Sequence, residues 1–587
     1  MEEEKHVYQI EYHERNIINL GDFIDCNNID GDDTFHLDKL QQYNPLYKTL
    51  FELDESNFNK IALNHKYHIK NKHEVYQVAR VNGIESIVDI SKNIFFKFSP
   101  LLDSIKYMIG KYDLNDKITN MPSILSTAED CHEKMLCRHN TSYVDNFFYF
   151  LSSMLLNNHN FIHGIDYYGS FLGIQSNFKV NITEDLEYLT TSDFFLENIG
   201  TLFTASEILT NNSTDNYTRK HKEELILGDE IEDIPFSDID SSFENSTLNN
   251  VVIADMIEFP VDFKTSSFFT DDLHDSYSSS SSDNSETNYS DTSDDDSEEH
   301  DDDNDDNDDD NDNNNDNNSE DEDDSSDCSS FDDELFAYIK KFPTQMICLE
   351  KCDKTFDQIL VENDYDDEIL GSILFQIVMI LLTYQKTFNF THNDLHTNNI
   401  MFINTETKFI WYKYNGNIYK VPTYGRICKL IDFGRSIYKI NEDVFCSDSF
   451  SPGGDGSTQY NCEPFLDTTK TYHAPNFSFD LCRLGCCLYD FVLLDDTGHS
   501  KLTPLQETVN RWVTDDNGHN VLYRKNGSVR YKGFKLYRMI ARTVTQHTPH
   551  NQLNFEFFNK FKQTKNKKHK KEESVIMNID DLPIYYK

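Results

Sequence analysis

The sequence predicts an α+β protein, built from antiparallel strands and long buried helices. Alternating apolar residues over 75–98, interrupted by an Asn-Gly pair, predict a β-hairpin and a further strand. Wide apolar faces over 143–156 and 369–384 predict two buried helices. Residues 271–334 contain 30 Asp and Glu and no Lys or Arg, so they are predicted to interrupt the fold as an acidic insertion.

The N-terminal half of the chain carries the predicted strands. Residues 1–74 contain no recognisable motif and are predicted to form an N-terminal extension. Over 75–98, the stretches VYQVAR, ESIVDI and IFFKF predict three antiparallel strands joined by short turns. Residues 143–156 have the apolar face of a helix, and aromatic residues around two glycines over 161–174 predict a return to strand.

Residues 177–334 form the predicted insertion. Its first part contains three stretches with the composition of ordered elements, FKVNI, DLEYL and VVIADMIEF. From about 271, Ser, Asp and Asn predominate, and such a segment cannot bury enough apolar surface to offset its ordering entropy, so we expect disorder. A solvated spacer is the simpler interpretation of this acidic tract, and a docking element for a basic partner is the alternative.

Order is expected to resume near residue 335. A strand is predicted over 345–350, a buried helix over 369–384, a hairpin around an Asn-Gly pair over 408–421, and a strongly apolar helix over 477–493. A cluster of seven lysines over 560–571 is predicted to end the ordered part as a solvated tail.

Composition excludes several classes of function. The chain has 52 Lys and Arg against 103 Asp and Glu, a net charge of −51, so nucleic-acid binding is not expected. The acidic start lacks the pattern of a signal peptide, and the apolar run over 369–384 is shorter than a membrane span and broken by polar residues. Twelve cysteines without paired CxxC motifs predict buried thiols in a reducing compartment. We therefore expect an intracellular protein without a membrane.

Two motifs in the second half carry the chemistry. Residues 392–399 read HNDLHTNN, and residues 429–434 read KLIDFG. In this order, after a buried helix and with a hairpin between them, they resemble the catalytic loop and the metal-binding motif of the protein-kinase superfamily. The simpler alternative is two unrelated loops, with Asp394 a helix cap and Asp432 a turn residue.

The kinase resemblance implies a role for each motif residue. Asp394 would accept the proton of the acceptor hydroxyl, whereas Asn399 and Asp432 would hold Mg²⁺ on the phosphates of ATP. His396, where serine/threonine kinases usually place a lysine, is a further candidate catalytic residue. The resemblance also implies structural roles for His392 in the first motif and for Phe433 and Gly434 in the second. Asp480, at the start of a buried helix, would tether the backbone of the loop over 392–399.

The nucleotide site is implied by matches further upstream. Lys97, in IFFKF, matches the strand lysine that binds the nucleotide phosphates, and Asp145 is the best candidate for the helix acid that holds it, although the family has Glu there. Glu129 and Glu133 are alternative acids. In simpler readings Lys97 is a snorkelling edge-strand lysine and Asp145 a solvated helix residue. The implied hinge positions that contact ATP are Glu350 and Cys352.

The sequence departs from the kinase pattern in several places. The glycine-rich loop that covers the phosphates is missing, and a tight hairpin over 81–84 stands in its place. Asn393 replaces the arginine that clamps a phosphorylated activation loop, which argues against that mode of switching. Residues 474–476 read APN rather than APE, and residues 449–460 would form a mobile segment before them.

The resemblance extends over most of residues 40–560 apart from the acidic insert. HNDLH is similar to haspin-type, choline and aminoglycoside kinases. Phrases such as SYVDNFFYFLSSMLL, FIHGIDYYGSFLG and NFSFDLCRLG are similar to serine/threonine kinases of giant amoeba viruses of the mimivirus type. The implied fold is a bilobal, protein-kinase-like one with a large acidic insertion in the N-lobe. The implied organisation is an extension over 1–74, an N-lobe over 75–176, an insertion over 177–334, an N-lobe strand and hinge over 335–350, a C-lobe over 351–559 and a lysine-rich tail over 560–587.

The expected function is transfer of the γ-phosphoryl group of ATP, with Mg²⁺, to a serine or threonine of a protein substrate. Two alternatives remain open. The missing glycine-rich loop suits a pseudokinase scaffold that binds nucleotide weakly or not at all, and HNDLH suits a small-molecule kinase of the choline or aminoglycoside type. An acceptor pocket built from extra C-terminal helices would favour the small-molecule kinase, and no such helix is evident after Phe491. The location would be the host-cell cytoplasm or the virion if the protein is viral.

Overall fold

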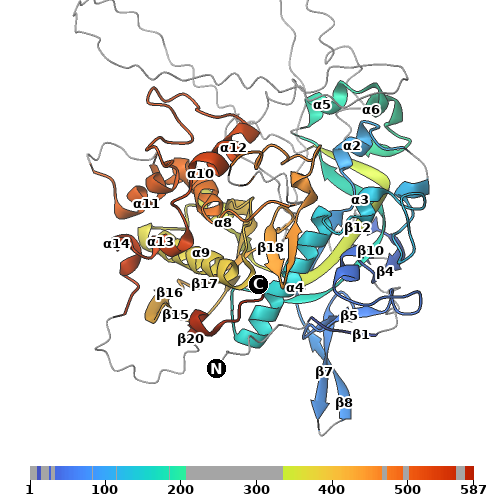
Figure 1. Cartoon of the computed structure of the whole chain (residues 1–587), viewed down its shortest axis with the longest axis horizontal. Coiled ribbons are helices and arrows are strands. Elements are labelled where there is room, and N and C mark those ends of the chain that lie inside the picture. Colours follow the sequence, from blue (N-terminus) through green and yellow to red (C-terminus); the bar gives the residue numbers. More distant parts are fainter. Residues whose placement is uncertain are drawn as a thin grey trace, which may run out of the picture. The chain divides into compact units, whose positions relative to one another are not determined.

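The computed structural model describes residues 10–14, 26–27, 34–81, 84–113, 116–183, 185–205, 335–463, 465, 472–493, 501–563 and 576–586. These residues contain both antiparallel sheets and long helices, which confirms the predicted α+β class (Figure 1). Their helices and strands pack around a large apolar cluster to which both halves of the chain contribute. The predicted strand over 251–259 and the acidic tract lie outside the described residues.

The main sheet has five antiparallel strands, in the order β11–β12–β10–β4, with β9 also paired to β12. Its strands are β4 (Leu37–Gln41), β9 (Ile94–Pro100), β10 (Tyr167–Asn181), β11 (Phe203–Ala205) and β12 (Phe336–Glu350). The long strands β10 and β12 pair along nearly their whole length, from Tyr167 opposite Leu349 to Asn181 opposite Phe336. They form the centre of the sheet, and β9 lies beside the C-terminal half of β12.

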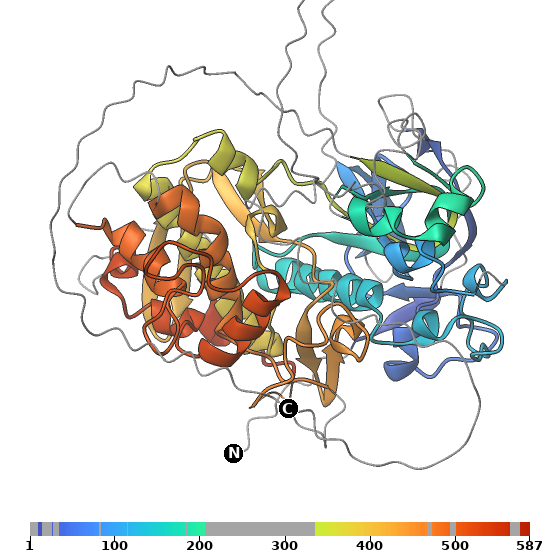
Figure 2. The same cartoon turned by 90° about the horizontal axis from the view of Figure 1, so that it is seen from above.

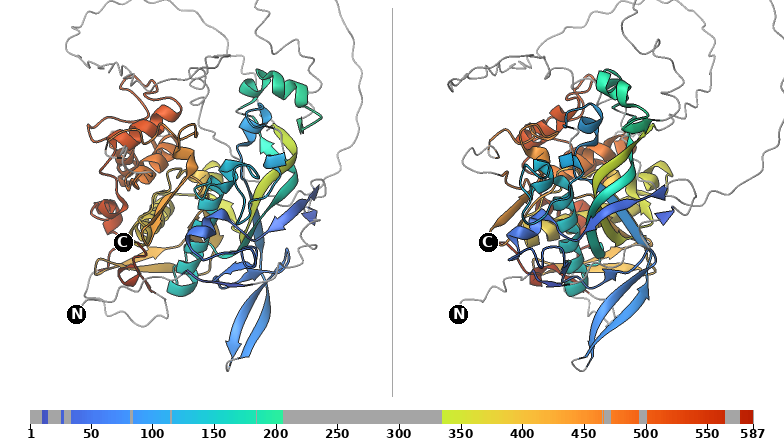
Figure 3. Two further views of the ribbon diagram at one scale, coloured as in Figure 1. Left: turned by 45° about the vertical axis from the view of Figure 1, so that its right-hand side comes forward. Right: turned by 90° about the vertical axis from the view of Figure 1, so that its right-hand side faces the viewer.

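The predicted hairpin over 75–91 is confirmed, but the predicted third strand is wrong in its pairing. Strands β7 (Glu74–Val81) and β8 (Ile84–Ser91) pair in full register. With β6 (His68–Ile69), they form a separate sheet that projects from the rest of the structure (Figures 1 and 3). Strand β9 instead joins β12 in the main sheet. The two strands are far apart in the sequence, so no local pattern could predict this pairing.

Residues 34–74 are more than the predicted extension. Strand β4 completes the edge of the main sheet, and β5 (Ile61–Leu63) pairs with β1 (Tyr12–Glu14). The short 3-10 helix over Pro45–Thr49 buries Pro45, Leu46 and Tyr47, and the last two belong to the core cluster. These elements were not predicted because each is only three to five residues long and the surrounding polar and aromatic residues form no clear periodic pattern.

Helix α4 (Thr141–His159) confirms the predicted helix over 143–156. The Asn140 side chain accepts a hydrogen bond from the Ser142 N–H at its start, and Asn160 ends it in the left-handed region, with φ 54°. Residues 142–155 are all buried, because α4 packs against the sheet on one side and the C-terminal half of the chain on the other. Figure 2 shows α4 between the blue and green strands and the orange and red helices.

The predicted helices of the second half are confirmed and joined by others. The long helices are α9 (Asp367–Phe388) and α10 (Phe479–Leu493). The shorter ones are α8 (Phe356–Val361), α11 (Pro504–Trp512), α12 (Phe534–Thr543), α13 (Pro549–Gln552) and α14 (Glu556–Asn559). In the described part of the chain α9 is the one helix long and apolar enough to cross a membrane, but 83% of its apolar window is buried inside the structure. It therefore has the surroundings of a core helix.

Two further sheets lie beside α9. Strands β13 (Lys354–Thr355), β14 (Ile400–Asn404) and β17 (Arg426–Leu430) form the first. The predicted hairpin over 408–421 is confirmed as β15 (Phe409–Tyr414) and β16 (Asn417–Pro422), and β20 (Ile576–Asn578) adds to β15 in parallel. A two-stranded ribbon, β18 (Ile437–Ile440) and β19 (Asp443–Cys446), follows β17.

Two stretches of the predicted insertion that had the composition of ordered elements, FKVNI and DLEYL, are ordered, as the end of β10 and as α5 (Leu186–Thr190). The end of β10, the short helices α5 and α6 (Asp193–Asn198), and β11 all lie within 177–205. Strand β11 precedes residues 206–334 and pairs with β12, which follows them. The two ends of that stretch therefore lie side by side in the main sheet.

The predicted end of order at the lysine cluster is wrong. Residues 576–586 return to the core, where Met577, Ile579 and Tyr585 are buried. The Lys386 ammonium, at the end of α9, donates to the carbonyl oxygens of Ile579 and Asp580. This C-terminal segment therefore anchors to α9 and to the β15–β16 hairpin, and no motif in its short sequence predicts these contacts.

We expect Ile579→Ala to lower the free energy of unfolding by about 2–5 kcal/mol, because it empties a fully buried site. Ile584→Ala is the matched control, since Ile584 is 51% exposed. Denaturant unfolding of both variants measures the difference. Equal effects would contradict the docking of residues 576–586.

Candidate active site

Lys97 is the centre of an ion triad that joins three elements. Its Nζ lies 2.8 Å from Asp145 Oδ2 on α4 and 2.9 Å from Asp432 Oδ1, which follows β17. In the main sheet Lys97 on β9 lies opposite Ile347 on β12. Its side chain extends to Asp145 on α4. The predicted pairing of Lys97 with Asp145 is thus confirmed, and neither Glu129 nor Glu133 takes that place. Both simpler readings, a snorkelling lysine and a solvated aspartate, are wrong.

The triad charges depend on one another. Burial disfavours the ammonium, but the carboxylates of Asp145 and Asp432 outweigh burial and raise the pKa of Lys97 well above its ordinary value. Burial raises the pKa of Asp145 to about 6, although Lys97 opposes this. Burial also acts on Asp432, but the lysine prevails and lowers the pKa of that carboxyl. The triad therefore holds a charged lysine between two carboxylates.

The backbone at Asp432 bends sharply to present its carboxylate. Asp432 has φ 60°, in the left-handed region, and its N–H donates to the Tyr149 hydroxyl over 2.9 Å. The next N–H, of Phe433, donates to Asp145 Oδ1 over 2.7 Å. Helix α4 thus fixes this turn through two consecutive backbone groups, and Asp145 binds both the turn and Lys97.

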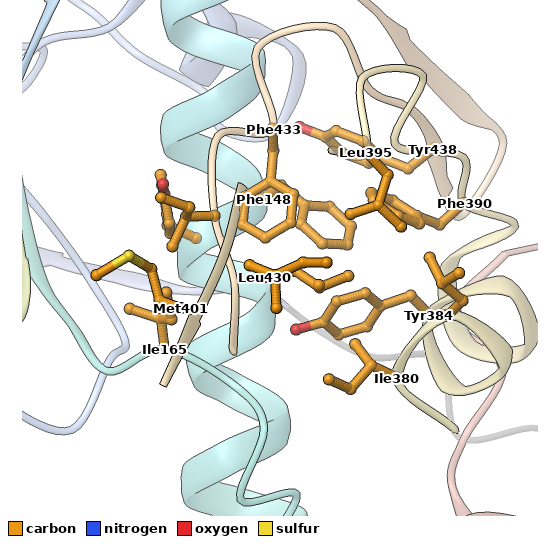
Figure 4. Close-up of a cluster of buried hydrophobic side chains, with 14 of the residues drawn as sticks. Phe148, Ile165, Ile380, Tyr384, Phe390, Leu395, Met401, Leu430, Phe433 and Tyr438 are labelled. Carbon is orange, nitrogen blue, oxygen red and sulfur yellow. The ribbon is translucent and has the colours of Figure 1, made fainter. Parts of the chain in front are cut away.

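Phe433 fixes the same turn from inside the core. Its ring lies 4.6 Å from that of Phe148 and 4.9 Å from that of Tyr149, both on α4. Figure 4 shows Phe433 within a cluster that also contains Phe390 and Leu395. Gly434 follows without a side chain because a Cβ there would approach Thr141 Cγ2 to 2.9 Å. Both residues therefore occupy the structural positions expected for them.

The loop over 392–399 is held by a buried carboxylate. Asp480, at the start of α10, accepts hydrogen bonds from the N–H groups of His392 and Asn393, each over 2.9 Å. The predicted anchoring of this loop by Asp480 is confirmed. Burial raises the pKa of Asp480 to about 6, although His392 and the two N–H donors oppose it. His392 Nε2 is also 2.9 Å from the carbonyl oxygen of Ile431 and links the two motifs.

The predicted mobile segment is packed against this loop. The Tyr460 hydroxyl donates to the Asn393 side-chain oxygen, and Tyr460 is fully buried. Asn393 Nδ2 donates to the carbonyl oxygen of Arg435 over 3.0 Å. The residue that replaces the expected arginine thus serves as a structural link between Tyr460 and the backbone after Gly434.

Asp394 lies half-buried among cationic groups. Its Oδ1 accepts a hydrogen bond from the Tyr537 hydroxyl over 2.9 Å. Burial would raise its pKa, but His396 in its protonated form, Arg435 and Arg483 outweigh burial and hold the pKa below its ordinary value. Asp394 is therefore ionised at neutral pH, as a proton acceptor must be.

His396 is close to Asp394 but carries no charge at neutral pH. Burial lowers the pKa of His396 to about 4, and the Asp394 carboxylate opposes this only in part. A neutral imidazole can donate one hydrogen bond but brings no positive charge to a phosphate. The lysine that serine/threonine kinases place here therefore has no electrostatic equivalent in His396.

Asn399 and Asp432 supply oxygen ligands suited to Mg²⁺. Asn399 Nδ2 donates to the carbonyl oxygen of Asp394 over 2.9 Å, so its amide oxygen is left for a ligand. The Asp432 side chain is 51% exposed and uses Oδ1 for Lys97. Within the described ranges no group of three or more His, Cys, Asp or Glu could hold a metal by itself. A Mg²⁺ bound with nucleotide needs only one or two protein ligands beside phosphate and water, so this pair fits.

Glu350 and Cys352 lie where β12 ends. Glu350 Oε2 is 3.1 Å from the buried Lys429 Nζ, which also donates to the carbonyl oxygen of Gly164. The Cys352 thiol is buried, and burial raises its pKa to about 12. The Glu350 side chain is thus engaged in an ion pair, and contact of this stretch with a nucleotide stays a prediction.

Three residues around Asp394 were missed by the sequence. Tyr537 comes from α12, and its hydroxyl accepts a hydrogen bond from Arg483 Nε over 2.8 Å. The Arg435 guanidinium lies over the Tyr537 ring and pairs with Asp455 over 2.6 Å. Arg435 directly follows Gly434, and Arg483 lies within the quoted phrase NFSFDLCRLG, so these two positions beside recognised motifs were the local signals. Tyr537 is 143 residues from Asp394 and matches no motif.

No protein-family model matches the chain. Over 83 residues it is 35% identical to Uncharacterized protein 098R of Invertebrate iridescent virus 6. This stretch covers 14% of the chain and 13% of the relative, so the two proteins share only a short similar segment. Neither finding assigns a family or an activity to the chain.

Asp480→Ala should lower the free energy of unfolding by about 2–6 kcal/mol, because two buried N–H groups lose their acceptor at roughly 1–3 kcal/mol each. Asp480→Asn keeps one acceptor oxygen and should cost less. Asp490→Ala, on the same helix, is the matched control because that carboxylate binds only the Tyr523 hydroxyl. Denaturant titrations in which Asp480→Ala behaves like the control would contradict the anchoring.

Proposed function

We propose that the protein is an ATP-dependent serine/threonine protein kinase with a bilobal, protein-kinase-like fold. The carrying observation is the triad, in which Lys97, Asp145 and Asp432 meet within 2.9 Å from three separate elements. These are the positions at which the sequence resembles the kinase lysine, helix acid and metal-binding aspartate. Two unrelated loops would have no reason to converge on one buried lysine.

The arrangement of elements supports the proposed fold. Strand β9 carries the lysine, α4 follows it with the acid, and β10 and β12 complete the sheet in the order that the resemblance implies. The chain then passes through residues 351–353 to helices and to the two motifs. We place the hinge of the two lobes at this passage.

The proposed mechanism assigns a role to each side chain of the candidate site. Mg²⁺ and ATP would supply the transferable phosphoryl group and neutralise its charge. Asp432 and Asn399 would bind the metal, and Lys97, positioned by Asp145, would bind phosphate oxygens. Asp394, kept ionised by the surrounding cations, would accept the proton of the acceptor hydroxyl.

A small-molecule kinase is the second candidate, and one observation favours it. Helices α11–α14 follow residue 500, which the sequence did not announce, and α12 brings Tyr537 to Asp394. Such helices can wall an acceptor pocket for a small alcohol. A peptide acceptor would have to pass Tyr537 to reach Asp394. The assay must therefore offer both protein and small-alcohol acceptors.

A nucleotide-free scaffold is the third candidate. The β7–β8 hairpin occupies a separate sheet and projects away, instead of joining β9 as a cover for phosphates. Against this candidate stand the ionised Asp394 and the pair Asp432 and Asn399, which a scaffold does not need.

The deciding experiment is transfer of radiolabelled phosphate from ATP, with Mg²⁺, to proteins and to amino alcohols. We expect transfer to protein hydroxyls, and Asp394→Asn should lower turnover by about 10²-fold or more because it removes the proton acceptor.

ATP should raise the melting temperature only with Mg²⁺, and Asp432→Ala should abolish that rise. Transfer to amino alcohols alone would establish the second candidate, and a rise without Mg²⁺ that survives Asp432→Ala would establish the scaffold.

Turnover should fall as the pH drops through about 6. The pKa values of Asp145 and Asp480 are both raised to about 6, so both carboxylates gain protons in that window. Protonation of Asp145 removes one of the two carboxylate partners of Lys97, and protonation of Asp480 weakens the acceptor of the loop N–H groups, whereas above pH 7 both carboxylates stay ionised. A pH profile of kcat/KM tests this, and Asp145→Asn should flatten its acid limb in part. A profile that stays level down to pH 5 would refute the assignment.

A further inference from the structure

We propose that Asp448 is a positioning residue that keeps α4 in the place where Asp145 meets Lys97, without any phosphorylation of the chain. The inference rests on the proposed function. Asp448 begins the short 3-10 helix Asp448–Phe450, which follows the β18–β19 ribbon after Gly434. It therefore belongs to the segment between the metal-binding motif and α10, far from α4 in sequence.

The Asp448 carboxylate binds the start of α4 with one oxygen and Lys134, which precedes α4, with the other. Oδ1 accepts hydrogen bonds from the Thr141 N–H over 3.0 Å and from Thr141 Oγ1 over 2.8 Å. Oδ2 lies 2.8 Å from Lys134 Nζ. A negative charge is favoured at this end of a helix, where backbone N–H groups lack intrahelical partners. The side chain is 11% exposed, so water screens these contacts little.

The surrounding contacts join the same two segments. The Asp448 N–H donates to the carbonyl oxygen of His139 over 2.8 Å. Thr141 Oγ1 also lies 3.0 Å from Ser447 Oγ and 3.3 Å from Ser449 Oγ. His139 Nδ1 is 3.1 Å from the carbonyl oxygen of Cys446. The start of α4 is thus bound along a whole stretch of the segment, with Asp448 as its one charged acceptor for Thr141.

The path from Asp448 to the triad is one helical turn long. Thr141 and Asp145 are four residues apart on α4, so they lie on the same face. Asp145 binds Lys97 and the Phe433 N–H, and the Gly434 backbone passes directly beside Thr141. A shift of α4 that separated Asp145 from Lys97 would also have to break the Asp448 contacts.

A carboxylate supplies this negative charge permanently. Segments that are ordered by phosphorylation acquire such a charge only after modification. Here Asn393 is bound by Tyr460 and serves a structural link, so the loop offers no arginine at that position for a phosphate. We infer that the site is assembled as soon as the chain folds.

The test compares kcat of full-length variants for phosphoryl transfer from Mg-ATP. Asp448→Asn should lower kcat about tenfold or more, and Asp448→Glu should restore part of the loss. Asp443→Asn is the matched control, because Asp443 lies on the same segment and pairs with Arg138 but does not touch α4. In an Asp145→Asn background, Asp448→Asn should have little further effect on kcat, because both residues act on Lys97.

The outcomes separate this inference from the proposed function. An inactive wild type without a Mg-ATP-dependent rise in melting temperature overturns the proposed function and this inference with it. An active wild type with an unaffected Asp448→Asn variant, or with additive losses in the double variant, overturns this inference alone. Activity that disappears after phosphatase treatment of the wild type also overturns it. A merely structural role would lower the melting temperature equally in both backgrounds and leave the losses additive.

Discussion

The largely buried ammonium of Lys97 is the constraint on which the site depends. Its side chain is 20% exposed, and an unpaired ammonium removed this far from water would be costly, so the fold must bring carboxylates to it. Asp145 comes from α4 and Asp432 from the turn after β17, and each contacts Lys97 within 2.9 Å. The same Asp145 also fixes the backbone N–H of Phe433. One ion triad therefore couples the main sheet, α4 and the turn after β17, and displacement of any one of them disturbs the others.

Local signals were sufficient for the elements that carry the triad. The apolar periodicity of 143–156 predicted α4, the aromatic strand around Lys97 predicted β9, and the two motifs placed Asp394, Asn399 and Asp432. Asp145 was predicted although it is shorter than the expected glutamate, and its Oδ2 lies 2.8 Å from Lys97 Nζ. The tether from Asp480 to the loop was predicted from a motif, and it is stable because a buried carboxylate and buried backbone N–H groups satisfy one another.

Contacts between distant segments could not be predicted. Strand β9 pairs with β12 rather than β8, and residues 576–586 dock on α9, although neither pairing has a sequence signature. Tyr537 reaches Asp394 from α12, and Asp448 reaches α4 from beyond the β18–β19 ribbon. Each of these contacts depends on the tertiary arrangement, and a single sequence reports only on neighbours along the chain. The features that shape the acceptor side and the positioning of α4 were therefore invisible before the structure.

The most direct test of the central claim is a crystal structure of the protein with Mg²⁺ and a non-hydrolysable ATP analogue. We predict a Mg²⁺ ion bound by Asp432 and Asn399, with Lys97 on a phosphate oxygen and still paired with Asp145. The acceptor side, between Asp394 and Tyr537, should be open to the terminal phosphate. A nucleotide bound elsewhere, or a triad that stays closed without metal at saturating nucleotide, would contradict the account.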